Sequence, residues 1–140
     1  MGRVYMPTID CPFQAARREL SRLKRETSAI VVDMHAEATS EKQAMGYFLD
    51  GRVSLVVGTH THVPTADHRI LPNGTAYMSD AGMCGDYDSV IGVRKDIPIL
   101  RFTRKMPTEK LVPADGEGMM CGTYMDIDDR TGLCKRIEVV

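Results

Sequence analysis

The pattern of apolar and polar residues predicts that helix and strand alternate along the first sixty residues. Residues 29–32 and 53–57 are short apolar runs rich in β-branched side chains, as in buried strands. A helix is predicted from Asp10-Cys11-Pro12, with Asp10 as the N-cap and Pro12 in the first turn. Its apolar face consists of Phe13, Ala16, Leu20 and Leu23. The chain therefore opens in the manner of an α/β protein.

A second helix is predicted between the two strands. Ser40 and Gln43 have the spacing of a capping box, and Asp50-Gly51 ends the helix. The predicted buried face consists of Ala44, Met45, Phe48 and Leu49. A strand–helix–strand unit of this kind forms a parallel pair with a right-handed crossover, so both strands end at the same edge of a sheet.

Polar residues follow both predicted strands at that edge. The first strand runs into Asp33, His35 and Glu37, and the second into Gly58-Thr59-His60-Thr61-His62. Residues two apart in extended backbone point to the same side, so His60 and His62 are expected to face one place. Ligands of open α/β sheets bind at the carboxyl ends of the strands. We therefore expect His35, His60 and His62 to converge there.

The second half of the chain has shorter elements. Hairpins are predicted over 69–78, around Pro72-Asn73-Gly74, and over 122–139. Residues 97–102 are predicted to form an edge strand, because Pro98 lacks a backbone donor. Residues 79–86 form a glycine-rich loop, and residues 105–118 an irregular connection.

Composition narrows the class of protein. With 140 residues we expect a single domain over 1–140, and a net charge of −1 gives no basic patch for nucleic acid. The apolar runs are too short to cross a membrane, and no apolar leader follows Met1. The four cysteines include no C-x-x-C pair, which favours reduced, mostly buried thiols. A cytoplasmic location is the resulting expectation.

The three histidines suit a metal centre, because neutral imidazole is the commonest metal-ligating side chain. A bound metal would turn water into a nucleophile toward a carbonyl or phosphoryl group. Further ligands, supporting groups or proton donors are expected among Asp33, Glu37, Asp67, His68 and Asp80, although His68 fits an exposed loop residue better. The backbone N–H groups of Thr39 and Ser40 could hold a phosphate, although a plain helix start is the simpler interpretation of Ser40. Thr61 completes the candidate substrate-binding residues.

Several segments resemble the bacterial calcineurin-like metallophosphoesterases of the YmdB group. The most specific is HAEATSEK at residues 35–42; the likeness continues through residues 50–67, 70–77 and 87–92. The resemblance implies an α/β fold, namely half of an αββα sandwich with a mixed sheet and flanking helices. It also implies a phosphodiesterase acting on 2′,3′- or 3′,5′-cyclic nucleotides. Two divalent metal ions are implied, iron or manganese, with zinc or magnesium as alternatives. His35 and His60 would bind one ion and His62 the other.

Members of that group are about twice as long, and the likeness is to their carboxyl-terminal half. The other half carries an aspartate, a bridging glutamate and an asparagine that bind the metals, and the histidine that protonates the leaving group. We therefore expect no catalytic residue in this chain, no activity of the chain alone, and an exposed apolar face that binds the other half or a second copy.

Three alternatives stay open from the sequence. One is a non-catalytic metal- or nucleotide-binding remnant that acts through a partner chain. Another is a self-contained mononuclear hydrolase in which Asp33, Asp67 or Asp80 supplies a fourth ligand. In the third, the histidines only form structural hydrogen bonds.

Overall fold

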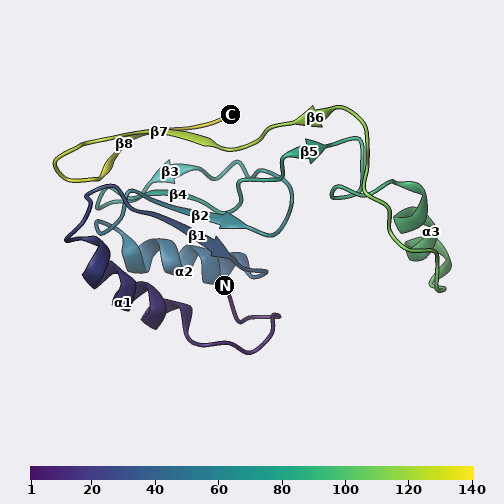
Figure 1. Cartoon of the computed structure of the whole chain (residues 1–140), viewed down its shortest axis with the longest axis horizontal. Coiled ribbons are helices and arrows are strands. Elements are labelled where there is room, and N and C mark those ends of the chain that lie inside the picture. The colour runs from purple at the N-terminus through teal and green to yellow at the C-terminus, as the bar shows by residue number, and fades with distance from the viewer.

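A four-stranded mixed sheet is the centre of the fold (Figure 1) in the computed structural model, which describes residues 1–140. The strands lie in the order β1-β2-β4-β3. β1 (Val31–His35), β2 (Leu55–Thr59) and β4 (Ala76–Met78) are parallel, and β3 (Arg69–Ile70) is antiparallel to β4. The predicted parallel pair and the predicted hairpin after residue 69 are both confirmed.

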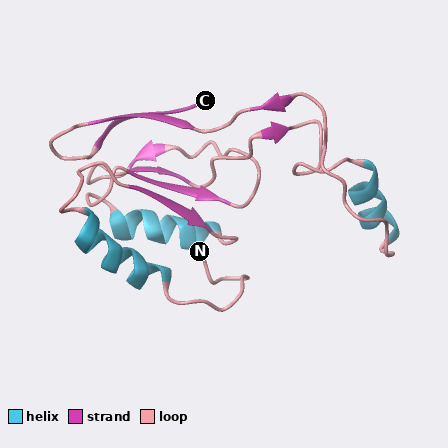
Figure 2. Ribbon diagram, viewed as in Figure 1, coloured by secondary structure: helices cyan, strands magenta, loops and turns pink.

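Two helices, α1 (Pro12–Leu23) and α2 (Thr39–Leu49), cover one face of the sheet (Figure 2). The main apolar core lies between these helices and the strands. It consists of Leu20, Ile30, Met34, Ala36, Met45, Leu49, Val53, Val56, Leu71 and Tyr77. Because parallel strands bury both faces, this layer covers only half of what the sheet needs.

The opposite face is covered by an antiparallel hairpin of β7 (Thr123–Ile127) and β8 (Cys134–Val139). This pairing confirms the hairpin predicted over 122–139. β8 contacts β3 and β4. Cys134 packs there with Leu55 and Ala76 in a second, smaller apolar cluster. The outer strand β1 is less covered, because the side chain of Val31, its first residue, is exposed.

A protruding arm consists of β5 (Gly85–Asp86), α3 (Asp96–Arg104) and β6 (Gly118–Met119) (Figure 1). The predicted edge strand over 97–102 is wrong, because these residues belong to α3. Pro98 lies in the first helical turn, where its missing N–H leaves no hydrogen bond unmade. Proline therefore marks a helix start here rather than a sheet edge. Exposed apolar side chains of the arm include Ile99, Phe102, Met106 and Met120.

The starts of the first elements differ from prediction. Cys11, not Asp10, is the N-cap of α1, although Pro12 does occupy the first turn. α2 begins at Thr39 after Ala38, with no side-chain cap, so the Ser40–Gln43 capping box is wrong. β1 begins two residues later than predicted and includes Asp33 and His35, which therefore lie within the strand.

The buried face of α2 is also rotated from the predicted one. Met45 and Leu49 are buried as predicted, but Ala44 and Phe48 are exposed. Glu41, Lys42 and Gly46 take the remaining buried positions. The carboxylate of Glu41 accepts the backbone N–H groups of Arg3 and Val4, so its burial is compensated by hydrogen bonds. Apolar periodicity gives no sign of these contacts of Glu41.

Two expectations from composition can be compared with the structure. Of the four cysteines only Cys134 is buried, while Cys84 is exposed and Cys11 and Cys121 are half-buried, so the expectation of mostly buried thiols is wrong. None of the helices combines the length and the apolar character needed to span a bilayer.

We predict that Leu49→Ala lowers the free energy of unfolding by about 2–5 kcal/mol, since this fully buried side chain fills the main core. The measurement is urea denaturation followed by circular dichroism. Tyr47→Ala is the matched control on the same helix, because Tyr47 is 57% exposed. Equal losses in both variants would contradict the assigned core.

Candidate metal centre

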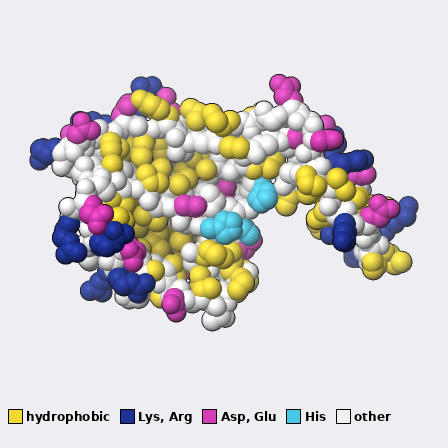
Figure 3. Space-filling model, viewed as in Figure 1, with side chains coloured by type: hydrophobic (Ala, Val, Ile, Leu, Met, Phe, Trp, Pro, Cys, Tyr) yellow, Lys and Arg dark blue, Asp and Glu magenta, His cyan; other side chains and the backbone are white.

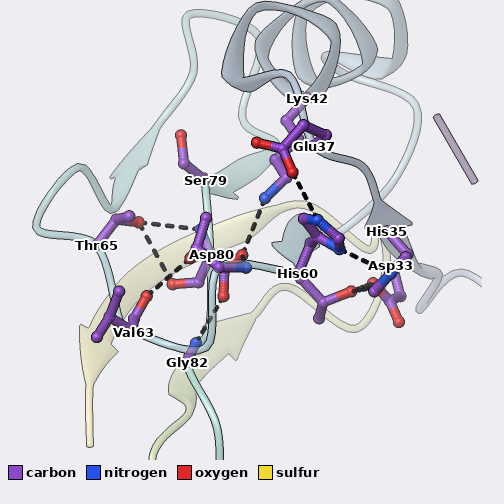
Figure 4. A network of polar contacts seen from close by, with 12 residues as sticks. Asp33, His35, Glu37, Lys42, His60, Val63, Thr65, Ser79, Asp80 and Gly82 are labelled. Carbon is purple, nitrogen blue, oxygen red and sulfur yellow. Dashed lines mark hydrogen bonds and ion pairs between the residues drawn. The ribbon is translucent and has the colours of Figure 1, made fainter. Parts of the chain in front are cut away.

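The register of β1 and β2 brings two of the predicted histidines together. His35 lies opposite Thr59 in the parallel ladder, and His60 follows directly. The Nε2 atom of His35 and the Nδ1 atom of His60 are 3.2 Å apart (Figure 4). The two rings meet edge to face at 87°, with centroids 4.9 Å apart. The predicted convergence at the carboxyl edge is thus present for this pair.

Hydrogen bonds on the outer side of His35 determine which of its nitrogens carries the hydrogen. The Thr59 hydroxyl donates its only hydrogen to Asp33 Oδ1 at 2.8 Å. Its oxygen lies 3.0 Å from His35 Nδ1, so it accepts the Nδ1–H hydrogen there. The neutral ring of His35 therefore has a free lone pair on Nε2.

His60 is held in the opposite tautomer. Its Nε2–H donates to the Glu37 carboxylate at 2.7 Å, which leaves the lone pair on Nδ1. When both rings are neutral, the two facing nitrogens, His35 Nε2 and His60 Nδ1, both lack a hydrogen. Two lone pairs at this separation repel unless a cation or a proton lies between them.

The spacing of these nitrogens fits a transition-metal ion. Nitrogen ligands lie about 2.0–2.1 Å from such an ion, so two of them at octahedral or tetrahedral angles are roughly 2.8–3.4 Å apart. The observed 3.2 Å lies within that range. An outer carboxylate or hydroxyl on each imidazole is also the usual support of metal-ligating histidines. His35 and His60 therefore fit as two ligands of one ion.

The other histidines do not join this pair. His62 Nδ1–H donates to the carbonyl of Ile91 at 2.9 Å, at the base of the arm. His68 is an exposed loop residue, as predicted. No group of three or more His, Cys, Asp or Glu side chains in the chain is placed to hold a metal ion. The chain therefore presents two nitrogen donors rather than a closed ligand set.

The backbone around these histidines is strained. His60 has a φ of 130° and His62 a φ of 67°, and residues other than glycine rarely adopt such backbone angles. Each such residue costs about 1–3 kcal/mol and persists only where its surroundings hold it. Such strain is concentrated at functional sites.

Asp80 lies beneath the loop formed by His60, Thr61 and His62, and it is completely buried. One of its oxygens accepts Lys42 Nζ and the backbone N–H of Thr61, each at 2.9 Å, and the other accepts the N–H of Gly82 at 3.0 Å. Burial opposes its charge, but these donors outweigh it and keep the pKa of Asp80 below its ordinary value. Asp80 is therefore neither a free metal ligand nor a proton donor.

Asp67 is occupied in a similar way. It accepts the hydroxyls of Thr65 and Ser79 and the backbone N–H of Ser79. Partial burial opposes its charge, yet these hydrogen bonds lower the pKa of Asp67. A mononuclear centre with Asp67 or Asp80 as the fourth ligand is therefore disfavoured, and Asp33 is used through Thr59.

Lys42 is the residue of this site that the sequence interpretation missed. It lies in α2, three residues before Met45 and seven before Leu49, so helical periodicity places it on the buried face of that helix. A lysine at a core position of an amphipathic helix indicates a buried ionic partner, because an unpaired buried ammonium is too costly. That spacing was the available signal.

The candidate substrate-binding residues lie around the same edge. Thr39 and Ser40 are exposed in the first turn of α2, and Thr61 is half-buried. Histidine side chains reach the surface between the body and the arm (Figure 3). No cavity is lined by His35, His60 or His62, so the pair lies on an open surface of this chain.

Fold and site define an α/β protein with a polar centre at the carboxyl edge of a parallel sheet. The chain belongs to the YmdB-like protein family, whose model matches residues 1–140. It is 47% identical over 137 residues to a Bacillus subtilis protein named 2′,3′-cyclic-nucleotide 2′-phosphodiesterase. That match covers 98% of this chain and 52% of the relative, so the chain spans about half the length of the curated relatives it matches.

Two solved structures share this fold. A Thermus thermophilus protein, described as hypothetical, matches with a TM-score of 0.88 at 40% identity, covering 99% of this chain and 53% of its own. A Mycoplasma pneumoniae protein described as a novel phosphatase matches with a TM-score of 0.81 at 36% identity, covering 92% and 45%.

We predict that the stability conferred by Asp80 is lost in acid. Its pKa in the folded protein lies below the unfolded value of about 3.9, so the unfolded state binds more protons as the pH falls. That stability is present above the unfolded pKa and disappears as the pH falls through the folded one. Urea denaturation at about pH 6 and about pH 3 should show a larger loss for the unmodified chain than for Asp80→Asn. An identical loss in both would refute the assignment.

Proposed function

We propose that this chain is part of a metal-dependent phosphodiesterase that hydrolyses cyclic nucleotides, with 2′,3′-cyclic nucleotides as the first substrates to test. The observation that carries the proposal is the pair of facing ring nitrogens of His35 and His60, 3.2 Å apart, each ring held on its outer side by a polar partner. The name of the Bacillus subtilis relative supports the substrate class. The fold would then be half of a calcineurin-like αββα sandwich, completed by the rest of a longer protein.

A bound divalent ion supplies a Lewis acid for the phosphoryl oxygen and an activated water molecule. The residues of this chain hold and orient that centre. His35 and His60 provide two nitrogen donors, and Glu37 and the Thr59–Asp33 pair keep their rings in the ligating tautomers. Iron or manganese is the proposed metal, with zinc or magnesium as alternatives.

A second ion would involve His62, as the resemblance implies. In this structure its Nδ1 is engaged with Ile91, so its Nε2 is the nitrogen left for a metal. Thr39 and Ser40 have backbone N–H groups at the start of α2, which suits them to a substrate phosphate. The remaining ligands and the proton donor would come from the other half of the protein.

The test is hydrolysis of a 2′,3′-cyclic nucleotide with added Mn²⁺. We compare the chain alone with the chain mixed with the part of the Bacillus subtilis relative that it does not cover. Turnover is expected only in the mixture, and His60→Ala should reduce it at least 100-fold. Equal turnover with and without His60→Ala would refute the proposal. Turnover by the chain alone would show that its own residues complete the site.

A non-catalytic role is the second candidate, favoured by the absence of a closed three-ligand group in the chain. In that case the chain would bind metal or nucleotide and act through a partner. Metal binding by the chain, lost in His60→Ala, without turnover in any mixture would support this role over catalysis.

We predict that Glu37→Gln weakens metal binding by about 10- to 100-fold, because a neutral amide no longer makes the His60 imidazole a strong donor. Isothermal titration with Mn²⁺ measures the change. Glu109→Gln is the matched control, since Glu109 is exposed on the arm and its carboxylate makes no hydrogen bond or ion pair. Unchanged affinity in Glu37→Gln would remove Glu37 from the site.

A further inference from the structure

Lys42 and Asp80 form an ion pair in the interior of the protein. Their side chains are each 1% exposed, and Nζ lies 2.9 Å from Oδ2. Removing two charges from water is so costly that apolar residues of similar size often stabilise a protein as well or better. Stability alone is therefore a weak reason for this pair.

The pair connects the strained loop to the rest of the fold. One oxygen of Asp80 accepts Lys42 Nζ (Figure 4). The same oxygen of Asp80 also accepts the backbone N–H of Thr61, the residue between His60 and His62. Its other oxygen accepts Gly82, in the loop after β4. Asp80 thus holds the backbone N–H of the residue that lies between His60 and His62, both of which have positive φ.

Gly58 makes room for this connection. A Cβ atom at Gly58 would collide with the Ser79 carbonyl oxygen and would lie 2.7 Å from Lys42 Cδ. The side chain of Lys42 therefore passes against β2 at the position where that strand has no side chain. The Lys42 side chain can reach from α2 to Asp80 only because residue 58 is a glycine.

We propose that Lys42 and Asp80 are positioning residues for the metal centre. Through the Thr61 N–H they hold the His60–His62 loop in its strained conformation, with His60 Nδ1 directed at His35. Lys42 fixes the position of the Asp80 carboxylate, which in turn fixes the loop. This inference rests on the proposed role of His60 as a metal ligand.

The experiment compares the unmodified chain with the double variant Lys42→Met/Asp80→Leu, which keeps the interior apolar and neutral. The measurements are hydrogen exchange of the Thr61 amide and the affinity for Zn²⁺, a diamagnetic probe. We expect the double variant to fold, its Thr61 amide to exchange at least tenfold faster, and its Zn²⁺ affinity to fall about tenfold or more. If it does not fold, Asp80→Asn replaces it, because that change keeps the size of the side chain.

Leu49→Ala is the control, because it destabilises the core at the opposite end of α2. A purely structural role of the ion pair predicts that Zn²⁺ affinity follows stability in both variants. Positioning predicts normal affinity in Leu49→Ala and reduced affinity in the double variant. Protection of Thr61 and affinity both unchanged in the double variant would overturn the inference.

Failure of the proposed function has a different signature. If neither the unmodified chain nor its mixture with the other half binds Zn²⁺, the two-histidine site is wrong, whatever happens to the loop. The exchange of Thr61 and the chemical shifts of His60 and His62 then decide alone whether the ion pair holds the loop. Loss of Thr61 protection would still support the holding role.

Discussion

The register of the parallel ladder between β1 and β2 is the constraint on which the site depends. It places His35 beside Thr59 and Asp33 beside Val57. Asp33 and His35 lie two residues apart and face the same side of the strand, so the single Thr59 hydroxyl reaches both. A slip of one residue would direct these side chains to the opposite face and separate them.

Helix α2 contributes to this constraint at both of its ends. Its C-terminal half supplies Met45 and Leu49 to the apolar core, which fixes the helix against the sheet. Its N-terminal half follows Glu37 and carries Lys42 to Asp80. The same element therefore packs on the sheet at one end and supports the loop that carries His60 at the other.

Topology made much of the site predictable from sequence. Apolar runs 29–32 and 53–57, with a helical segment between them, were enough to place His35 and His60 at one sheet edge. Long-range polar contacts were not predictable in this way. The direction of His62 depends on a carbonyl of Ile91, 29 residues away, and the burial of Lys42 on Asp80, 38 residues away. The helix at 96–104 was missed because a proline fits both an edge strand and a first helical turn.

Gly58 has a consequence for how this sequence can vary. A side chain at position 58 would collide with the backbone of Ser79 and the stem of Lys42 at once. The loop after β4 and the buried lysine would both have to change before any other residue could enter. Positions 42, 58 and 79 are therefore sterically coupled, so that a side chain at position 58 requires a different residue at position 42 and a shifted backbone at position 79.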